Sequence, residues 1–471
     1  MKHSPFPTKL ATLVLAIALT SILSAEHLAA DFVVDRNDDD GSASACTAAP
    51  NDCSLRGALS AAVASAEDDS ITFDPGVFSA DSFVRLNGRL SVNGGGAISI
   101  DGSDARLVTV DAQNSGGVFF VGTAGNLSIS NLSITGGNLN LTFGGGIDNR
   151  GVLNVSQSTF YNNRGGSGGA IFNNGGSVAI SNSTLCSNNS AYGGAYHSVG
   201  TAAVTVFRDS TICSNTATYG GGIYVSSGSV SLENTIIANN SGGAGGPDVW
   251  RTVNSLGFNL IGNSSGMTFS GANATDRTDV DPMLDPAGLA DNGGNSLTVA
   301  LLPESPAIDT GYSLSEEDQR GATRPVDVPD SADGTGNLAD TGAFEVQYEV
   351  EEPPTTTFEW GGFRRPIREN HYNLAKAGWL FPVKFSLNGF QGMDILAEGS
   401  PTSVKIGCFS RTPIGDPEPI RTHGNPALKY NQGRDFYKMV WKTKRQWRWS
   451  CRRLSVTLSD GSVHSADFLF W

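Results

Sequence analysis

Lysine is missing from most of this chain. From Asp31 to Val350 there are 12 Arg, no Lys and 34 Asp and Glu, so the balance (12 − 34) is −22. From Phe358 to Trp471 there are 17 Lys and Arg against 9 Asp and Glu, so the balance (17 − 9) is +8. Opposite charges predict two domains, residues 31–348 and 358–471. The stretch between them, residues 349–357, is acidic and rich in Pro and Thr, as a stiff linker is.

Long apolar runs are also scarce. The one clear run lies in "MKHSPFPTKLATLVLAIALTSILSA", where basic residues precede it and small residues follow. This order is typical of a secretory signal peptide, so residues 1–30 are left out of the fold, with cleavage expected between Ala25 and Ala30. No other stretch is long enough to cross a membrane as a helix. We therefore expect a protein that is secreted or held at a bacterial cell surface or envelope, without a transmembrane helix.

Cysteine is rare, at six residues. An even number in an exported chain favours disulfides, and close spacing suggests Cys46–Cys53, Cys186–Cys213 and Cys408–Cys451. For Cys186 and Cys213 the alternative is two free, buried thiols. No Cys/His spacing suggests zinc, and no Gly-rich loop suggests a nucleotide, so we expect no cofactor apart from a possible Ca²⁺.

What the sequence does contain is a repeat. "STLCSNNSAYGGAY" begins at Ser183, "STICSNTATYGGGIY" at Ser210 and "STFYNNRGGSGGAIF" at Ser158. Repeats of this length predict stacked units. The copies align at residues spaced by 26, 25, 27 and 24: Ser133, Thr159, Thr184, Thr211 and Thr235.

Each copy contains short segments in which apolar residues alternate with polar ones, such as "LNVSQSTF" and "VAISNSTL", and Gly and Asn mark the turns. This pattern predicts an all-β fold, a right-handed parallel β-helix of the pectin-lyase-like kind, over residues 31–348. Neighbouring turns would lie about 4.7–4.9 Å apart, which suits a disulfide between Cys186 and Cys213. Stacked asparagines are expected to form a structural ladder. They are Asn163, Asn188, Asn215 and Asn239.

Residues 358–471 have a different pattern. Alternating runs such as "LSVTL" and "SADFLFW", separated by Gly and Asp turns, predict a small antiparallel β-sandwich. Its aromatic residues are expected in the core more than on a binding surface.

Several motifs resemble known families. "CTAAPNDCSLRGALSAA" resembles the CSLREA-type N-terminal motif of bacterial surface β-helix proteins, which implies a cap and a first coil. "DPMLDPAGLADNGGNSLTVALLPESPAIDTG", "DQRGATRP" and "DTGAFE", within Val280–Glu345, resemble the choice-of-anchor Q family. "GGAI", "GGGI" and "FYNN" resemble polymorphic outer-membrane proteins, and "FPVKFSLNG" at Phe381–Gly389 resembles the PxKF-type module of exported bacterial proteins. No C-terminal hydrophobic anchor or sortase-like motif follows, so the mode of attachment stays open.

β-Helices host polysaccharide lyases and hydrolases, which need carboxylates and cations close together. Between residues 131 and 240 the acids are Asp148, Asp209 and Glu233, and the cations are Arg150, Arg164 and Arg208. Asp209 and Glu233 fall on adjacent turns and are a candidate acidic pair, with a solvated face as the alternative. His197 is expected to face solvent. No catalytic residue is assigned.

Two acidic stretches, "DRNDDDGS" at Asp35–Ser42 and "DRTDVDP" at Asp276–Pro282, could bind Ca²⁺ or simply be solvated turns. The segment "KTKRQWRWSCRR" at Lys442–Arg453 interleaves cations with tryptophans, which suits anionic polysaccharide or phosphate-rich lipid. The alternatives are a strand with one basic and one buried face, or docking on the acidic solenoid. The candidate binding residues are Arg445, Trp447, Arg448, Trp449, Arg452 and Arg453.

These observations favour a non-catalytic, adhesin-like protein that binds extracellular polysaccharide or another cell-surface polymer, and no nucleic acid. The alternative is a polysaccharide lyase or glycoside hydrolase acting in a groove of the β-helix. Three or more charged side chains converging in a groove of the solenoid would favour the enzyme.

Overall fold

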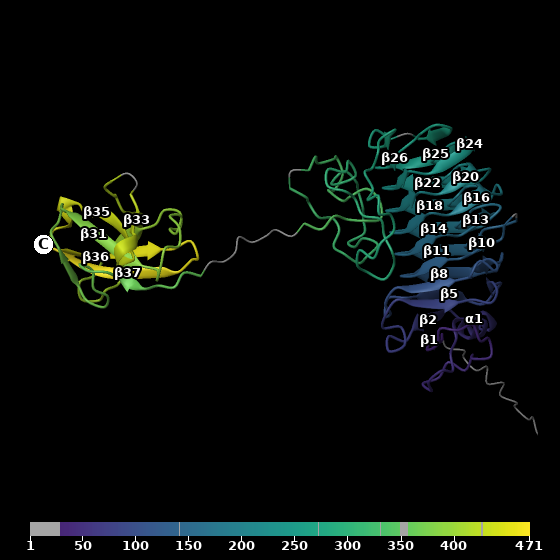
Figure 1. Cartoon of the computed structure of the whole chain (residues 1–471), viewed down its shortest axis with the longest axis horizontal. Helices are drawn as coiled ribbons and strands as arrows, with labels where there is room; N and C mark the ends of the chain where they lie inside the picture. The colour runs from purple at the N-terminus through teal and green to yellow at the C-terminus, as the bar shows by residue number, and fades with distance from the viewer. Residues whose placement is uncertain (1–28, 141, 272, 330, 349–356, 425–426) are drawn as a thin grey trace, which may run out of the picture. The chain divides into compact units, whose positions relative to one another are not determined.

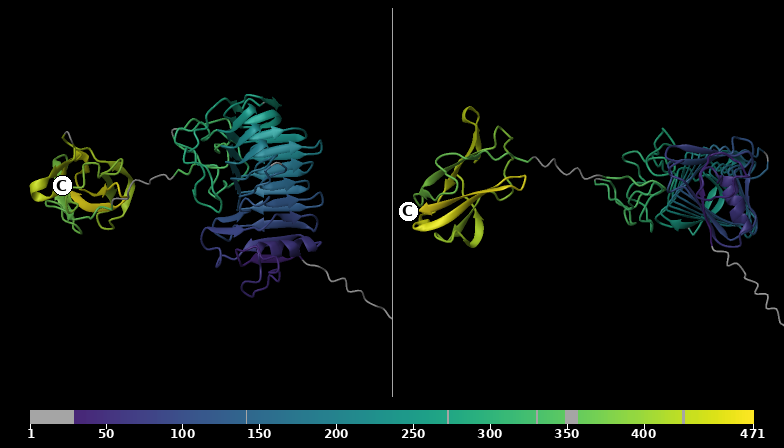
Figure 2. Two further views of the ribbon diagram at one scale, coloured as in Figure 1. Left: turned by 45° about the vertical axis from the view of Figure 1, so that its right-hand side comes forward. Right: turned by 90° about the horizontal axis from the view of Figure 1, so that it is seen from below.

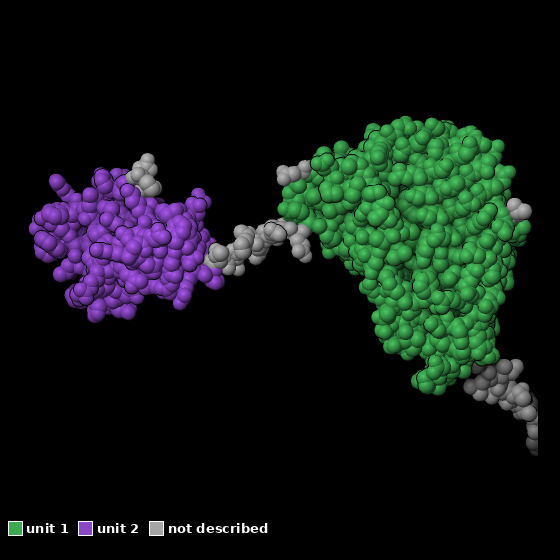
Figure 3. Space-filling model, viewed as in Figure 1, with its two compact units in different colours: residues 1–348 green, residues 349–471 purple. Residues whose placement is uncertain are grey.

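The computed structural model describes residues 29–140, 142–271, 273–329, 331–348, 357–424 and 427–471. They belong to two compact units, unit 1 up to Tyr348 and unit 2 from Glu349, each with its own hydrophobic core (Figure 3). The predicted signal peptide lies almost wholly outside the described residues, and so does the predicted linker. Among the described residues no helix is long and apolar enough to cross a membrane.

Unit 1 is a parallel β-solenoid with strands stacked on three faces (Figure 1). The first face consists of β1 (Asp31–Val34), β2 (Asp69–Phe73), β5 (Ala97–Asp101), β8 (Asn126–Ser130), β11 (Val152–Ser156), β14 (Ser177–Ser181), β18 (Val204–Arg208), β22 (Ser229–Glu233), β25 (Val249–Gly257) and β27 (Met267–Ser270). The second face consists of β3 (Ser82–Arg85), β6 (Val108–Asp111), β9 (Ser133–Thr135), β12 (Thr159–Tyr161), β15 (Thr184–Cys186), β19 (Thr211–Cys213), β23 (Ile236–Ala238), β26 (Leu260–Ile261) and β28 (Arg277–Thr278).

The third face ends at β25, which turns the corner and also belongs to the first face. Its other strands are β4 (Leu90–Val92), β7 (Phe119–Val121), β10 (Ile147–Asn149), β13 (Ile171–Asn174), β17 (Tyr196–Val199) and β21 (Ile223–Val225). A short side sheet contains β16 (Asn189–Tyr192), β20 (Thr216–Tyr219) and β24 (Ser241–Gly245). One turn of the solenoid, here called a rung, therefore has one strand on each face.

The alternating pattern of the sequence sets the core. Along β14, Val178 and Ile180 are buried while Ser177 and Ala179 are exposed, and Val178 pairs in register with Leu153 of the rung before. The corner after β8, β11, β14, β18 and β22 of the first face adopts positive φ, a conformation that Asn and Asp tolerate better than most residues. These corner residues are Asn131, Gln157, Asn182, Asp209 and Asn234.

The repeat register follows the sequence prediction except at its end. Thr159, Thr184 and Thr211 pair with one another in successive rungs. Thr211, however, pairs with Ile236, so the prediction of Thr235 was wrong by one residue. The last repeat is therefore 25 residues long and not 24, because Thr235 lies one residue before Ile236, the residue that stacks on Thr211.

The buried asparagine ladder forms with one change. The Nδ2 atoms of Asn163 and Asn188 donate to the Oδ1 atoms of Asn188 and Asn215 at 3.1 and 3.0 Å. Asn215 donates in turn to Asn240 at 2.9 Å, and not to Asn239, which occupies a positive-φ corner. The prediction that Asn239 belongs to the ladder was therefore wrong. Interior amides in register satisfy one another, which makes this ladder structural.

The "GGAY" and "GGGI" turns require glycine for a steric reason. Gly193 has φ 64°, and a Cβ there would lie 2.0 Å from the Tyr196 carbonyl oxygen. Gly220 of the next rung has φ 62° and the same clash with the Ile223 carbonyl oxygen at 2.3 Å. The chain can therefore make this tight turn only where a residue has no side chain.

A helix covers the N-terminal end of the solenoid (Figure 2, right). This helix, α1 (Leu55–Ala64), begins at Ser54, whose hydroxyl accepts a hydrogen bond from the Gly57 N–H at 3.0 Å. Its Leu and Ala side chains are buried against the core. The capping segment expected near Cys46 and Cys53 therefore forms, as an amphipathic helix.

Residues 279–329 and 331–348 form an irregular lobe that covers the second face (Figure 1). The stacked threonines hold it: the Gln319 amide accepts from the Thr184 hydroxyl at 2.6 Å and donates to that of Thr159 at 2.9 Å. The Ala343 N–H donates to the Thr211 hydroxyl at 3.0 Å. The repeated threonine thus serves as a rail on which the lobe docks, a role that the sequence did not reveal.

All six cysteines form disulfides in the expected pairs. The Cα–Cα distances are 4.4 Å for Cys46–Cys53, 4.7 Å for Cys186–Cys213 and 5.2 Å for Cys408–Cys451. The second joins adjacent rungs, as the shared register predicts, and the lobe buries it.

Unit 2 consists of two sheets around a core that includes Phe385, Trp441 and Phe468. The first sheet has β29 (Gly362–Phe363), β31 (Leu380–Ser386), β35 (Phe436–Lys442) and β34 (Lys429–Asn431), with η1 (Gln432–Arg434) before β35. The second has β30 (Asn373–Ala375), β37 (Val463–Phe470), β36 (Ser450–Thr457), β32 (Thr402–Ile406) and β33 (Pro413–Pro419). Pairing is antiparallel except between β30 and β37. The predicted fold class, a parallel β-helix followed by a small antiparallel β-sandwich, is confirmed.

Candidate functional site

The basic segment of unit 2 is not one continuous strand. Arg445–Trp447 form a short 3-10 helix, η2, Trp449 has φ 61°, and β36 begins only at Ser450. The alternative of a strand with one basic and one aromatic face is therefore wrong for most of the segment.

Three of the six candidate residues make contacts that hold unit 2 together. Trp447 is buried in the core, and the Arg452 guanidinium lies 4.2 Å from its ring centre. Arg452 is itself buried and donates to Glu418 at 2.7 Å. Arg453 donates to Asp467 at 2.8 Å. Since their polar groups already have partners, these side chains are poorly placed to bind a ligand.

The other three candidates, Arg445, Arg448 and Trp449, are exposed. Arg445 and Arg448 line an open hollow of about 550 Å³ together with Ala377, Gly378 and three cationic or aromatic residues from elsewhere in the chain. Those three are Lys376, Trp379 and Trp471. We call the hollow and its lining the unit 2 hollow. The tryptophans Trp379, Trp449 and Trp471 are 62 %, 71 % and 49 % exposed, so large ring areas remain open beside the cations.

Backbone hydrogen bonds fix the segments that line the unit 2 hollow. The Ala377 N–H donates to the Trp471 carbonyl at 3.1 Å, and the Trp449 N–H donates to that of Phe470 at 2.7 Å. Gly378 has φ 83°, and a Cβ there would lie 2.4 Å from Arg445 Cγ, so glycine lets the arginine pack against the loop. Within unit 2, the end at Trp471 lies opposite the end at which the described chain enters (Figures 1 and 2).

The chemistry of the unit 2 hollow is cationic and aromatic. Lys376 Nζ lies 4.2 Å from the centre of the Trp379 ring and 5.6 Å from that of Trp471. Among the described residues no carboxylate forms an ion pair with Lys376, Arg445 or Arg448. Free guanidinium groups bind carboxylate, sulfate or phosphate, and open rings offer an apolar surface beside them. This combination suits an anionic ligand with an apolar face.

Sequence reasoning missed Lys376, Trp379 and Trp471. The available signal was the spacing in "KAGW", where a cation and a tryptophan flank a glycine. Trp471 carried a weaker signal: Phe468 and Phe470 of "FLFW" are buried, and Trp471 continues beyond the strand. The expectation that the aromatic residues belong to the core therefore holds for Trp441 and not for the tryptophans of the hollow.

Aromatic rings also stack along the third face of unit 1, in β17 and β21, and along the adjacent side sheet, in β16 and β20. The His197 ring lies 4.8 Å from the Tyr224 ring at 25°, and Tyr192 lies 5.9 Å from Tyr219 at 8°. Near-parallel rings at these distances cover one another's faces, so this ladder mainly stabilises the stack of rungs. His197 is buried, so the expectation that it faces solvent was wrong. Burial lowers the pKa of His197 to about 4, and the ring is neutral at pH 7.

A charged cluster interrupts this ladder. The Asp148 carboxylate lies in register between Phe120 and Phe172, with the guanidinium groups of Arg89 and Arg150 at 3.8 and 3.5 Å. Burial raises the pKa of Asp148, and the two arginines oppose that shift. Three charged side chains therefore converge on the third face, which fulfils one part of the expectation for an enzyme, a cluster of charges within a groove.

The candidate pair Asp209 and Glu233 does not work as a pair, because different arginines neutralise its two carboxylates. Glu233 accepts a hydrogen bond from Arg208 at 2.7 Å. Asp209 is buried against the lobe, 3.7 Å from Arg324, and burial raises its pKa. A shared acid–base site is not formed.

The "DQRGATRP" and "DTGAFE" motifs meet in a buried ionic network of the lobe. Arg324 donates to Glu345 at 2.8 Å, and the Asp340 N–H donates to the same oxygen at 2.8 Å. Burial raises the pKa of both Asp340 and Glu345. This network of buried groups ties the lobe together.

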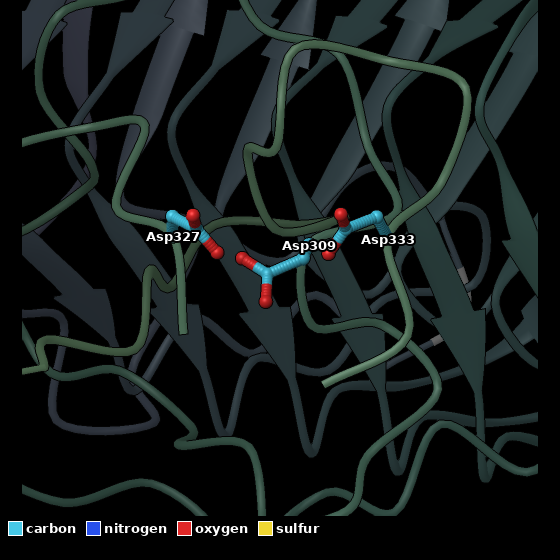
Figure 4. Close-up of side chains that lie close together, drawn as sticks. All are labelled: Asp309, Asp327 and Asp333. Atoms are coloured by element: carbon cyan, nitrogen blue, oxygen red, sulfur yellow. The ribbon is translucent and has the colours of Figure 1, made fainter. Parts of the chain in front are cut away.

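The two acidic stretches, interpreted as either Ca²⁺ sites or solvated turns, both use carboxylates as hydrogen-bond acceptors, the first within its own turn and the second from a residue 15 positions earlier in the chain. Asp40 accepts from Ser42 and Asp279 accepts from Ser264. Among the described residues, one group of three carboxylates has oxygens within 4.8 Å of one another, and it lies in the lobe, outside both stretches (Figure 4). Its members are Asp309, Asp327 and Asp333. Oxygen ligands of this kind suit Ca²⁺, although Asp309 already accepts hydrogen bonds from Ser331 and the Val328 N–H.

No protein-family model matches the chain, and neither the curated proteins nor the solved structures contain a significant match to it. The resemblances to the choice-of-anchor Q family and to the PxKF-type module therefore rest on the sequence motifs alone.

Proposed function

We propose that this is an exported protein of the bacterial cell surface that binds acidic polysaccharide without cleaving it. The observation that carries the proposal is the unit 2 hollow. Cations that form no ion pair with a described residue meet open tryptophan rings there in one concave surface. The signal-like N-terminus and three disulfides support export. The motif resemblances support a secreted bacterial β-helix with a PxKF-type module.

A glycan array with the full chain tests the proposal. We expect binding to carboxylated or sulfated glycans at low salt. The Debye length falls from about 10 Å at 0.1 M salt to about 3 Å at 1 M, so high salt should abolish most of the signal. Charge reversal at Arg445 and Arg448 (R445E/R448E) should weaken binding at least tenfold. The control K429E/R434E reverses two exposed cations of unit 2 that lie outside the hollow and should leave binding within twofold.

Other partners give different results. Binding to anionic phospholipid vesicles in place of glycans would identify a lipid ligand and reject the proposal. If unit 2 instead binds the acidic solenoid of its own chain, R445E/R448E should expand the protein in small-angle scattering, with no glycan binding before or after the change.

Polysaccharide cleavage is the second candidate, favoured by the convergence of Arg89, Asp148 and Arg150. It predicts unsaturated or reducing-sugar products from acidic polysaccharide. Loss of those products in the D148N variant would establish it. If no product forms with polysaccharides that the array shows to bind, the non-catalytic proposal holds.

A further inference from the structure

Two buried polar atoms of the third face have no partner. Asp148 is 1 % exposed, and its Oδ1 atom accepts no hydrogen bond from any described residue. The Nε atom of Arg150 is also buried and donates to none of the described residues. Folded proteins satisfy nearly all such groups, so an unpaired acceptor beside an unpaired donor calls for an explanation.

The two arginines of this cluster are held loosely. The contacts of Arg89 and Arg150 with Asp148 are 3.8 and 3.5 Å, at the long end for ion pairs, and each side chain is about one-third exposed. Both guanidinium groups also lie over the Phe120 ring, at 4.7 and 5.3 Å from its centre. Phe143, beside Arg150 at 5.4 Å, is 40 % exposed and forms an apolar wall. Among the described residues, the two guanidinium groups donate one hydrogen bond, a long one of 3.5 Å from Arg150 to Asp148, so their exposed N–H groups remain available to a ligand.

The local charge is unusual for unit 1. Two arginines and one carboxylate give a balance of +1 within a segment whose balance is −22. The arginines therefore exceed what is needed to neutralise Asp148. A second anionic group would match the excess, and the guanidinium fork is suited to hold it.

We infer that Arg89, Asp148 and Arg150 form a second binding site, on unit 1, for an acidic sugar unit that has a hydroxyl group next to its anionic group. The guanidinium groups hold the anionic group. The hydroxyl donates to Asp148 Oδ1 and accepts from Arg150 Nε. Both atoms are buried in the free protein, so the two arginine side chains shift when the sugar enters. This inference rests on the proposed function in its ligand class, and it adds a site that is separate from the unit 2 hollow.

Calorimetric titration of the full chain tests this site. The probe is the trimer of galacturonic acid, and the trimer of galactose is the neutral control. The R445E/R448E chain removes the unit 2 hollow from the measurement. In this background we expect one binding site, an affinity at least tenfold lower after R89Q/R150Q, and a smaller loss after R150K, which keeps the charge without Nε. The matched control R85Q/R164Q removes two exposed arginines of unit 1 that form no ion pair with a described residue, and it should leave the affinity within twofold.

The outcomes separate this inference from the proposed function. If R445E/R448E abolishes binding that the unaltered chain shows, the unit 2 hollow stands and the inference fails. If binding survives R445E/R448E and is lost with R89Q/R150Q, the inference stands. Equal binding of the neutral trimer, or equal losses in R89Q/R150Q and R85Q/R164Q, would overturn it. Circular dichroism of each variant shows whether a loss comes from unfolding, and R150K provides the test if the double variant does not fold.

Discussion

Replacing Asn188 by alanine tests how much the interior ladder contributes to stability. The Asn188 side chain accepts from the Asn163 backbone N–H at 3.1 Å and donates to the Phe160 carbonyl at 2.9 Å and to Asn215 at 3.0 Å. Alanine removes all of these partners inside a dry core. A buried polar group left without a partner costs about 1–3 kcal/mol. With three partners affected, we expect the free energy of unfolding to fall by roughly 4 kcal/mol, near the lower end of the summed range.

The matched control is Asn154→Ala, because Asn154 lies on the exposed side of β11 and makes only a long 3.3 Å contact with Ser128. It should change the free energy of unfolding by about 0.5 kcal/mol or less. Urea denaturation measures both variants, and hydrogen exchange should show faster opening of the rungs around Asn188. If the two variants differ by less than about 1 kcal/mol, the ladder is not the stabilising element that we infer.

Three further predictions concern the disulfide, the domain boundary and pH. The Cys186–Cys213 disulfide spans 27 residues, so replacing both cysteines by alanine should lower stability by roughly 3 kcal/mol, and non-reducing peptide mapping should find neither thiol free. Limited proteolysis near Glu349–Thr357 should release a stable C-terminal fragment of about 110 residues, a normal domain size, and unfolding of both halves would place the boundary elsewhere. Burial raises the pKa of Asp248 from 3.8 to about 6, so its contribution to stability is full below pH 3.8 and is lost as pH rises to about 6. Asp248→Asn should therefore gain up to roughly 3 kcal/mol relative to the unaltered chain between pH 4 and pH 6, and a constant difference in denaturation curves would contradict this.

The solenoid could be predicted because its physical causes are local and repeated. Alternation such as that of Val178 and Ile180 fixes which residues enter the core, and register then places Cys186 beside Cys213. The spacing from the repeated Thr predicted Asn239 in the ladder instead of Asn240, because spacing within one repeat does not reveal a shift of one residue. Register depends on pairing with the neighbouring rung, which composition does not report.

The sites were less predictable because they join residues far apart in the chain. Arg445 and Arg448 were found from their local sequence, but Lys376 and Trp471 reach the same hollow only through the fold of unit 2. Likewise, Arg89 lies two rungs before Asp148. It is outside residues 131–240, the range from which the sequence predicted charged candidates. Burial also cannot be inferred from residue type, and His197 shows this: its ring is covered by rings from adjacent rungs.

The most direct test of the central claim is a titration of the full chain with an acidic oligosaccharide, followed by tryptophan fluorescence at about 0.1 M and 1 M salt. Trp379 and Trp471 are exposed beside Lys376, so a bound sugar should change their emission. We predict a saturable change at low salt that is strongly reduced at high salt and absent in R445E/R448E. A saturable change of the same size in R445E/R448E, or no change at low salt, would contradict binding of acidic polysaccharide in the unit 2 hollow.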